Sequence, residues 1–261
     1  MRCLEADQLD QHRGRRIARE DTFCFRCHPG IGCFNQCCRN LNLFLYPYDV
    51  IRLKHSLKIS SDEFLDRYVD VVLRPSSYFP EVLLHMSETA EKTCPFLVPQ
   101  GCRVYPDRPD TCRSFPIERG MYFDAAIDTG MPVYFYRPPD FCMGQHEDTA
   151  WTIDEWLTDQ DAHLYNAMTQ RWAELKRLFQ ADPWGPEGPQ GPKAKMVFMA
   201  TYNIDRFREF VFQSSFLSRY AVHPPVVRCI RSNDAELLDF AMAWVKLILW
   251  GIAGVKIGPK R

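Results

Sequence analysis

The sequence predicts an α+β fold, in which a cysteine-rich, loop-rich region with short antiparallel strands packs with several helices, mostly C-terminal. Two observations favour this class. Short apolar runs broken by Pro and Gly occupy the middle of the chain, whereas apolar residues recur with helical spacing beyond residue 150. Nine of the 11 cysteines lie between residues 24 and 142. At 261 residues and 46% hydrophobic composition, the chain is long enough for one large domain or two small ones.

The charge balance disfavours two classes of partner. The chain carries 32 basic and 33 acidic residues mixed along its length, for a formal charge of −1. This gives no electrostatic reason to expect nucleic acid or an anionic membrane as the main partner. The most membrane-like stretch, residues 240–254, is too short to span a bilayer comfortably and contains Lys246. We therefore expect a buried C-terminal helix there and no membrane span.

The N-terminal residues and the cysteine count bear on the compartment. The first twenty residues are polar and lack the apolar core of a secretory signal peptide, so we expect a cytoplasmic protein. The cytoplasm keeps thiols reduced, which weakens a disulfide interpretation of the cysteines and strengthens a metal interpretation. Cys3 and Cys229 lie far from the others in the sequence, and we expect both to be unligated thiols.

Capping patterns and apolar periodicity predict the elements of the first half. A short helical pattern in "YPYDVIRLKHSL" is followed by Ser60 and Glu63, which have the spacing of a capping box. Ile59 and Phe64 occupy the staple positions on either side, so we expect a helix over residues 61–69. Further on, short strands are predicted in "VLLHM", "CRVY", "IERGMYF" and "VYFYR".

The second half is predicted to be helical. Thr152 and Glu155 form another capping box, and apolar residues continue from it at helical spacing to Phe179. "DPWGPEGPQGPK" cannot continue a helix or a strand, and two further helices follow, in "NIDRFREFVFQSSFLSRY" and "DAELLDFAMAWVKLILWG". We divide the chain into a polar N-terminal segment (1–22), a cysteine-cluster domain (23–146), a long amphipathic helix (150–181), a Pro/Gly linker (182–193) and a C-terminal helical region (194–261).

The cysteines form two dense groups and one outlier. The first group reads C-x2-C-x5-C-x3-C-C over residues 24–38, the second reads C-x7-C-x9-C over residues 94–112, and Cys142 follows. Thiolates are soft ligands that suit zinc, copper(I) or iron–sulfur clusters. The spacing is unlike that of a simple zinc finger, and the thiols are too many for one tetrahedral site. The pattern indicates one cluster with spare thiols or two metal centres.

The adjacent pair Cys37 and Cys38 narrows these alternatives. Neighbouring side chains diverge, so the two thiols cannot easily bind one small ion. They could reach different irons of one cluster or two separate sites. The alternative is one ligand beside a buried thiol, because free cysteine is common in protein cores.

Three arginines lie within a few residues of the second group. Arg103, Arg108 and Arg113 could offset the negative charge of several bound thiolates and tune a redox potential. The alternative for each of them is a place in a solvated basic loop.

The ordered motifs resemble one family. The run from Cys27 to Cys38, followed by "CPFL", "GCRVYPDRPDTCRSFP" and a later cysteine, resembles the CxxCxxCC cysteine-cluster family, often called the YkgJ family. Its members are described as chelating zinc or iron and as containing iron–sulfur clusters, and flagellin lysine N-methylases belong to its wider circle. The resemblance spans residues 25 to about 142, and "PYDVIRLK" and "FREFVFQSSFL" are similar to parts of full-length bacterial members.

The resemblance implies a set of metal ligands. The cysteines implied by the family are Cys27, Cys37, Cys38, Cys94, Cys102 and Cys112, with Cys33 and Cys142 as additions. The chain departs from the shorter family spacing by inserting "HPGIG" before Cys33, which leaves the ligand set of the first group open.

Two residues near the first group have alternative roles. Cys24 lies outside the family motif and forms a C-x2-C with Cys27, but no βαβ pattern follows as a thioredoxin-like redox pair would require. His28 could be a borderline ligand, although we favour a role in packing or capping the turn at Pro29 and Gly30.

Three functions remain open from the sequence. We favour a redox or catalytic iron–sulfur protein holding a 4Fe–4S cluster, because the thiols exceed four and nearly all candidate ligands are sulfur. The alternatives are a zinc-stapled binding or structural module and, by analogy with relatives, a flagellin-lysine-methylase-like enzyme. No G-x-G-x-x-G, Ser-His-Asp or H-E-x-x-H pattern supports a named reaction, so catalytic residues and enzyme status stay undefined.

Overall fold

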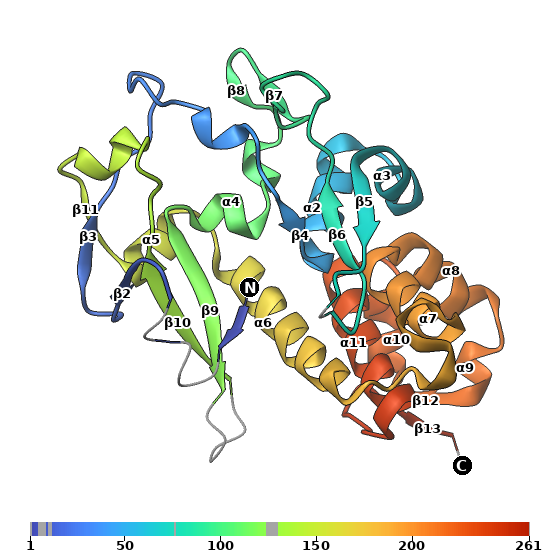
Figure 1. Ribbon diagram of the computed structural model, residues 1–261. Helices are drawn as coiled ribbons and strands as arrows, with labels where there is room; N and C mark the ends of the chain where they lie inside the picture. The colour runs from blue at the N-terminus through green and yellow to red at the C-terminus, as the bar shows by residue number, and fades with distance from the viewer. Residues whose placement is uncertain (1, 5–8, 10–11, 76, 124–129, 261) are drawn as a thin grey trace. The chain divides into compact units, whose positions relative to one another are not determined.

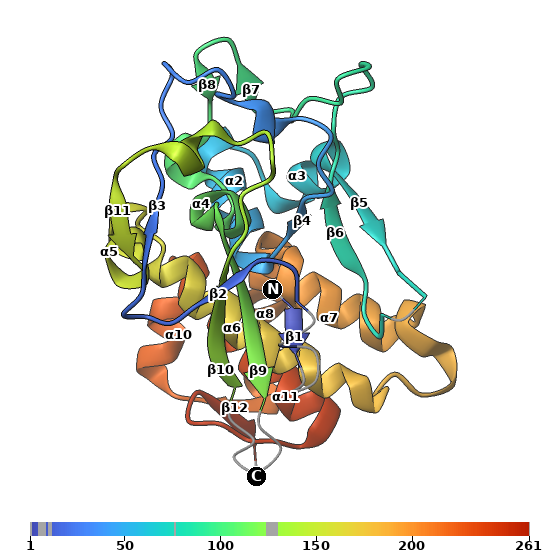
Figure 2. The same ribbon diagram turned by 60° about the vertical axis from the view of Figure 1, so that its left-hand side comes forward.

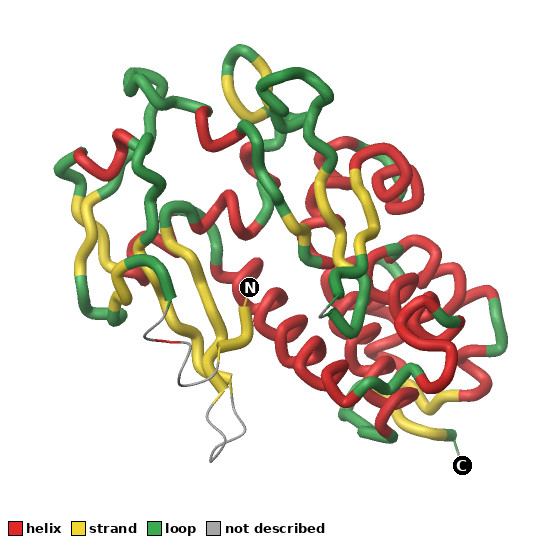
Figure 3. The backbone as a smooth tube through the Cα atoms, viewed as in Figure 1, coloured by secondary structure: helices red, strands yellow, loops and turns green. Residues whose placement is uncertain are grey.

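A computed structural model describes residues 2–4, 9, 12–75, 77–123 and 130–260, without the side chains of Arg2 and Cys3. Helices, short strands and long loops are all present, which confirms the α+β class (Figure 3). The chain divides into two compact units, each formed by two separate segments. The cysteine unit comprises residues 1–43 and 85–173, and the helical unit comprises residues 44–84 and 174–261. Residues 44–84 lie within the predicted cysteine-cluster stretch (23–146), yet they pack with the C-terminal helices.

The largest sheet of the cysteine unit has four strands. In spatial order they are β1 (Arg2–Leu4), β9 (Ile117–Phe123), β10 (Gly130–Tyr136) and β2 (Arg15–Ile17). The antiparallel pair β9 and β10 forms the centre, β2 adds antiparallel to β10, and β1 adds parallel to β9 (Figure 1). This confirms the two strands predicted from "IERGMYF" and "VYFYR". The sheet supplies a rigid base beside the cysteine-bearing loops.

The other elements of the cysteine unit are short. They are β3 (Thr22–Cys24), η1 (Gln36–Cys38), β7 (Leu97–Val98), β8 (Gly101–Cys102), η2 (Tyr105–Asp107), α4 (Asp110–Ser114), η3 (Met143–His146), β11 (Ala150–Thr152), α5 (Ile153–Asp159) and most of α6 (His163–Leu178). The prediction of a single helix over residues 150–181 is therefore wrong, because this stretch forms two helices, α5 and α6. Ala162 N–H bonds to the Leu157 carbonyl across Asp161, whose φ is +50°, and this left-handed turn ends α5. The predicted Thr152–Glu155 capping box is confirmed.

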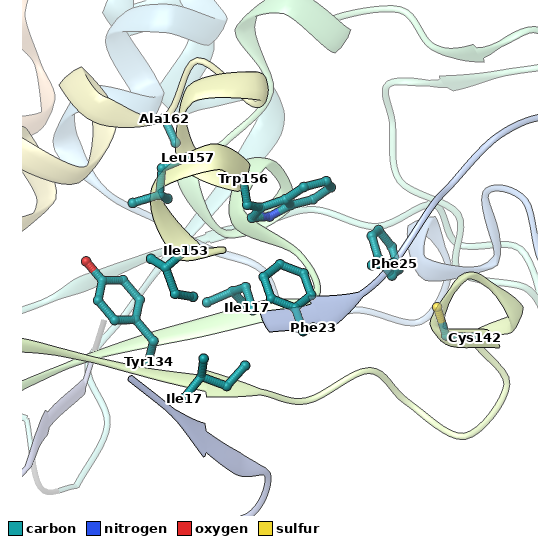
Figure 4. Close-up of a cluster of buried hydrophobic side chains, with 10 residues drawn as sticks. All are labelled: Ile17, Phe23, Phe25, Ile117, Tyr134, Cys142, Ile153, Trp156, Leu157 and Ala162. Atoms are coloured by element: carbon teal, nitrogen blue, oxygen red, sulfur yellow. The ribbon is translucent and has the colours of Figure 1, made fainter. Parts of the chain in front are cut away.

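The core of the cysteine unit connects α5 to the strand that leads into the first cysteines. Its buried members are Ile17, Phe23, Phe25, Ile117, Tyr134, Cys142, Ile153, Trp156, Leu157 and Ala162 (Figure 4). Trp156 meets Phe25 edge to face at 5.4 Å between ring centroids. Its indole N–H donates to the Ser114 carbonyl at 3.1 Å, so the same ring also holds the end of α4. One side chain thus supports two of the cysteine-bearing segments.

The helical unit combines a small sheet with a bundle of helices. Its antiparallel sheet has the order β4 (Phe44–Leu45), β6 (Glu81–Leu84) and β5 (Val69–Val72). The remaining elements are α2 (Pro47–Leu57), α3 (Ser61–Tyr68), η4 (Phe179–Ala181), η5 (Gly185–Gln190), α7 (Pro192–Tyr202), α8 (Ile204–Gln213), α9 (Phe216–Arg219), β12 (Tyr220–Val222), α10 (Pro224–Ile230), α11 (Asp234–Trp250) and β13 (Ile257–Pro259). The predicted Ser60 cap is confirmed, since its hydroxyl accepts from the Glu63 amide at 3.1 Å. None of the helices in the described ranges is long and apolar enough to cross a membrane.

A polar network joins four helices of the helical unit. The Lys54 ammonium on α2 lies 2.8 Å from an Asp205 oxygen on α8 and 3.1 Å from an Asp234 oxygen on α11. The other Asp205 oxygen accepts from the Ser61 amide at 2.7 Å, which fixes the start of α3. The Lys54 side chain is only 8% exposed. Because removing one partner leaves a buried charge uncompensated, the network specifies how these helices pack.

The network predicts an acid-sensitive contribution from Asp205. Burial raises the pKa of Asp205, but Lys54 and Ser61 outweigh burial and hold this pKa below its ordinary value. Its stabilisation is therefore complete above the unfolded pKa of about 4 and is lost as pH falls through the lower folded value. We expect Asp205→Asn to cost about 2 kcal/mol near neutral pH and progressively less below pH about 4. Urea denaturation at several pH values measures this, with the exposed Asp66→Asn on α3 as control, and a cost independent of pH would contradict it.

Candidate metal centre

The first cysteine group is hydrogen-bonded to the segment around Cys142. Arg26 N–H donates to the Gly144 carbonyl at 3.0 Å, and Phe25 N–H donates to the Thr149 carbonyl at 2.8 Å. The Met143 amide donates directly to the Cys33 sulfur at 3.1 Å. Residues more than a hundred positions apart are thus adjacent around Cys27, Cys33 and Cys142.

The end of the first group is hydrogen-bonded to the second. Cys94 N–H donates to the Cys38 carbonyl at 2.8 Å, and Arg39 and Thr93 form an isolated antiparallel bridge. The β7–β8 hairpin then pairs Leu97 with Cys102. Figures 1 and 2 both draw this hairpin beside η1, which carries the vicinal cysteines. The structure therefore brings together the two groups that the sequence separates by more than fifty residues.

The vicinal pair lies in the 3-10 helix η1. Asn35, in the left-handed conformation with φ 63°, precedes it, and the two thiols hydrogen-bond to each other. This thiol–thiol bond, with burial and the charge of Cys38, raises the pKa of Cys37 well above its ordinary value. Because a 3-10 helix turns about 120° per residue, the two Cα–Cβ bonds diverge. The side chains nevertheless bring the two sulfurs within hydrogen-bonding distance of each other, so whether the pair serves one metal ion or two stays a prediction.

Three sulfurs face backbone amides of the residues that follow them. Cys94 accepts from Phe96 and Leu97, Cys102 from Val104, and Cys142 from Gly144 and Gln145. Such amides stabilise a thiolate and are a common second layer around metal-bound sulfur. Without metal, burial is the stronger effect and raises the pKa of Cys94 to about 11. These thiols are therefore protonated at neutral pH, and a metal ion must displace their protons to bind.

The Cys27 side chain is exposed, yet partial burial of its thiol and the neighbouring thiols shift its pKa. Burial raises the pKa of Cys27 to about 11, and the charges of Cys37, Cys142 and Cys33 add to the increase. Mutual repulsion of this kind is relieved when a cation binds between thiolates. The donor set therefore fits a soft metal or an iron–sulfur cluster.

The sulfurs do not form a closed coordination shell. Within the described residues, no three His, Cys, Asp or Glu side chains lie close enough to hold one metal ion. The fold brings the backbones of the cysteine-bearing segments together, in loops that Figure 3 draws in green and in the short elements η1, β8 and α4. The ligand set of Cys27, Cys33, Cys37, Cys38, Cys94, Cys102, Cys112 and Cys142 therefore stays a prediction.

The residues expected to lie outside the set have varied positions. Cys24 is exposed on β3, and Cys229 is exposed in the helical unit. The side chain of Cys3 lies outside the described residues. The expected role of His28 as a turn cap is confirmed, since its Nδ1 accepts from the Gly30 amide at 3.1 Å.

The three arginines differ, and one of them bears on the thiols. Arg108 is 8% exposed and donates to the Tyr105 carbonyl at 2.7 Å and to the Gln160 side chain at 2.6 Å. Burial lowers the pKa of Arg108, while the charges of Cys112 and Cys102 partly oppose that change. Its guanidinium is thus a fixed positive charge near two predicted ligands.

The other two arginines have their own contacts. Arg113 is 2% exposed, donates to the Pro106 carbonyl at 2.6 Å and lies over the Tyr165 ring at 4.1 Å. Arg103 lies over the Phe96 ring at 5.6 Å and lowers the pKa of Cys102 in addition to Arg108. The alternative of a solvated basic loop is wrong for Arg108 and Arg113, which are buried.

Two site-supporting residues were not identified from the sequence. The Gln160 side chain accepts a hydrogen bond from Arg108, 52 positions away in the sequence. No local sequence pattern predicts such a contact. For Gly144 the sequence does offer a signal, because this glycine stands two positions after the candidate ligand Cys142. A Cβ at Gly144 would lie 2.7 Å from the Arg26 carbonyl oxygen, so only glycine allows this close approach of the two loops.

Replacing Arg108 tests its electrostatic role. We expect Arg108→Gln to weaken metal binding about tenfold, because a charge near two thiolates is worth on the order of 1 kcal/mol in a partly buried site. Competition against a chromogenic chelator measures the affinity. Arg108→Lys keeps the charge and loses the two-pronged hydrogen bonding, so it should recover most of the affinity. Equal losses in both variants would show that Arg108 acts only through packing.

The fold and these thiols define a cysteine-cluster domain. Residues 26–148 match the model of the CxxCxxCC family, described as "Putative zinc- or iron-chelating domain". These residues are therefore a CxxCxxCC domain, which confirms the family resemblance. The matched range includes all eight predicted ligands and excludes Cys24 and Cys229. Searches of curated proteins and of solved structures each returned no match.

Proposed function

We propose that the domain binds a 4Fe–4S cluster through thiolates supplied by separate chain segments, and that the bound group serves a redox or catalytic role. The observation that carries this proposal is the direct hydrogen bonding among three cysteine-bearing segments, around residues 27–38, 94–102 and 142–144. When bound, such a cluster accepts and donates one electron at a time. A reducing compartment such as the cytoplasm would keep the thiols available.

Several features of the chain suit a cluster of this kind. Thiol ligands outnumber the four that one zinc ion requires, and the region supplies them with amide donors. Arg108 adds a positive charge near Cys102 and Cys112, which would raise the potential of a bound cluster. Zinc held by the same cysteines as a structural staple is the alternative, and it would supply folding free energy without electron transfer.

Anaerobic purification tests the proposal. We expect the wild-type protein to be brown and to contain iron and acid-labile sulfide in about equal amounts, with broad visible absorption that bleaches on reduction. A colourless protein with zinc and without sulfide would overturn the cluster and support the zinc staple. A protein with neither metal, even after reconstitution with iron and sulfide, would overturn both.

A further inference from the structure

The contacts around the cysteines sort the eight predicted ligands into two sets. In the first set, Cys27 and Cys33 lie on a loop that is hydrogen-bonded to the segment carrying Cys142. Within this set the Met143 amide, next to Cys142, donates to the Cys33 sulfur at 3.1 Å. The close approach of Gly144 to the Arg26 carbonyl keeps the two loops together.

The second set is connected by different contacts. Cys94 N–H donates to the Cys38 carbonyl at 2.8 Å, and the β7–β8 hairpin carries Cys102 back beside Cys94. Cys112 follows on α4, and the guanidinium of Arg108 acts on both Cys102 and Cys112. No hydrogen bond among the described residues joins the backbones of residues 94–112 to those of residues 142–149.

The vicinal pair lies where the two sets adjoin. The Cα–Cβ bonds of Cys37 and Cys38 diverge by about 120° along η1, while the two sulfurs stay within hydrogen-bonding distance of each other. Cys38 belongs with the second set, because its carbonyl holds Cys94. Cys37 then remains for the first set, because the Gln36 amide beside it donates to the Cys33 carbonyl at 2.9 Å. The charge of Cys37 acts on Cys27 and also on Cys94 and Cys102, as expected for a residue between the two sets.

We propose, on the basis of the thiolate metal site proposed above, that this domain holds two adjacent metal centres. One centre is formed by Cys27, Cys33, Cys37 and Cys142, and the other by Cys38, Cys94, Cys102 and Cys112. Four thiolates complete the tetrahedral shell of one metal ion and equally the four corners of a 4Fe–4S cluster. The vicinal pair supplies one ligand to each centre, which explains why two adjacent cysteines are useful in this sequence.

Cobalt titration of the full chain tests the number of centres. Co²⁺ binds four-thiolate sites that take zinc or iron, and its thiolate charge-transfer absorption counts bound ions. Four variants are compared with wild type under anaerobic conditions, each checked by circular dichroism for folded helices. They are Cys27→Ser/Cys142→Ser, Cys94→Ser/Cys102→Ser, the quadruple variant that combines them, and Cys229→Ser as the matched control.

The expected stoichiometries are distinct. Wild type and Cys229→Ser should bind two Co²⁺ ions per chain, each double variant one, and the quadruple variant none. A single Co²⁺ ion in wild type, lost in either double variant, would overturn the two-centre proposal and leave the proposed metal binding intact. Double variants that both still bind two ions would overturn the ligand assignment. No binding by wild type would overturn the metal site itself.

Discussion

Removing the metal is expected to loosen the cysteine-bearing loops and leave the helical unit almost unchanged. Those loops are held by isolated hydrogen bonds and two-stranded pairs such as β7–β8 and β3–β11, which are marginal alone. When only the folded state binds the metal, a free metal concentration about 1,000 times the dissociation constant adds about 4 kcal/mol to the free energy of unfolding. The helical unit has its own aromatic core around Phe207, Phe240 and Trp244. This core contains none of the predicted metal ligands, so its stability should not depend on metal.

Hydrogen exchange read by mass spectrometry locates the effect. After anaerobic chelation, amides in residues 25–40, 92–104 and 142–149 should exchange much faster, while amides of α7, α8 and α11 keep their rates. Restoring the metal should restore protection. Unchanged protection in the three cysteine segments would mean that metal contributes nothing to their order.

Replacing Trp156 by alanine is expected to cost the cysteine unit about 3–5 kcal/mol, the range for removing a buried aromatic ring. Trp156 is 5% exposed, packs against Phe23 and Phe25, and donates to the Ser114 carbonyl. The loss should reduce metal affinity too, because Phe25 leads into Cys27 and Ser114 ends the helix that carries Cys112.

A second variant at the same position separates packing from hydrogen bonding. Trp156→Phe keeps most of the ring contacts and loses the indole donor, so we expect a cost of about 1–2 kcal/mol. Urea denaturation measures both variants, and metal titration follows in each. A Trp156→Ala protein as stable as Trp156→Phe would show that this core does not support the site.

Local signals in the sequence predicted much of the fold. The caps at Ser60 and Thr152 and the strands at residues 117–123 and 133–137 depend on neighbours within a few positions, and all are present. The break in the predicted helix after α5 was missed because it depends on Asp161 adopting the left-handed conformation, which Asp does only occasionally.

Contacts between residues that are distant in the sequence were harder to predict. The interruption of the cysteine unit by residues 44–84 follows from β4, β5 and β6 pairing with one another and packing with distant helices, which no local pattern encodes. For the site, the sequence indicated which thiols to consider, but not that the side chains of Cys37 and Cys38 hydrogen-bond to each other. It could not indicate that Cys33 meets the Met143 amide or that Gln160 holds Arg108, since these contacts exist only after folding.

The metal content of a Cys37→Ser/Cys38→Ser variant shows whether the vicinal pair lies at the metal site. Elemental analysis of protein purified anaerobically, beside wild type and Cys229→Ser, gives metal atoms per chain. If thiolates from separate segments bind metal around the vicinal pair, wild type and Cys229→Ser should contain equal metal and the paired variant should lose most of it. Full metal content in the paired variant, with its helices intact, would show that neither Cys37 nor Cys38 is needed to bind the metal.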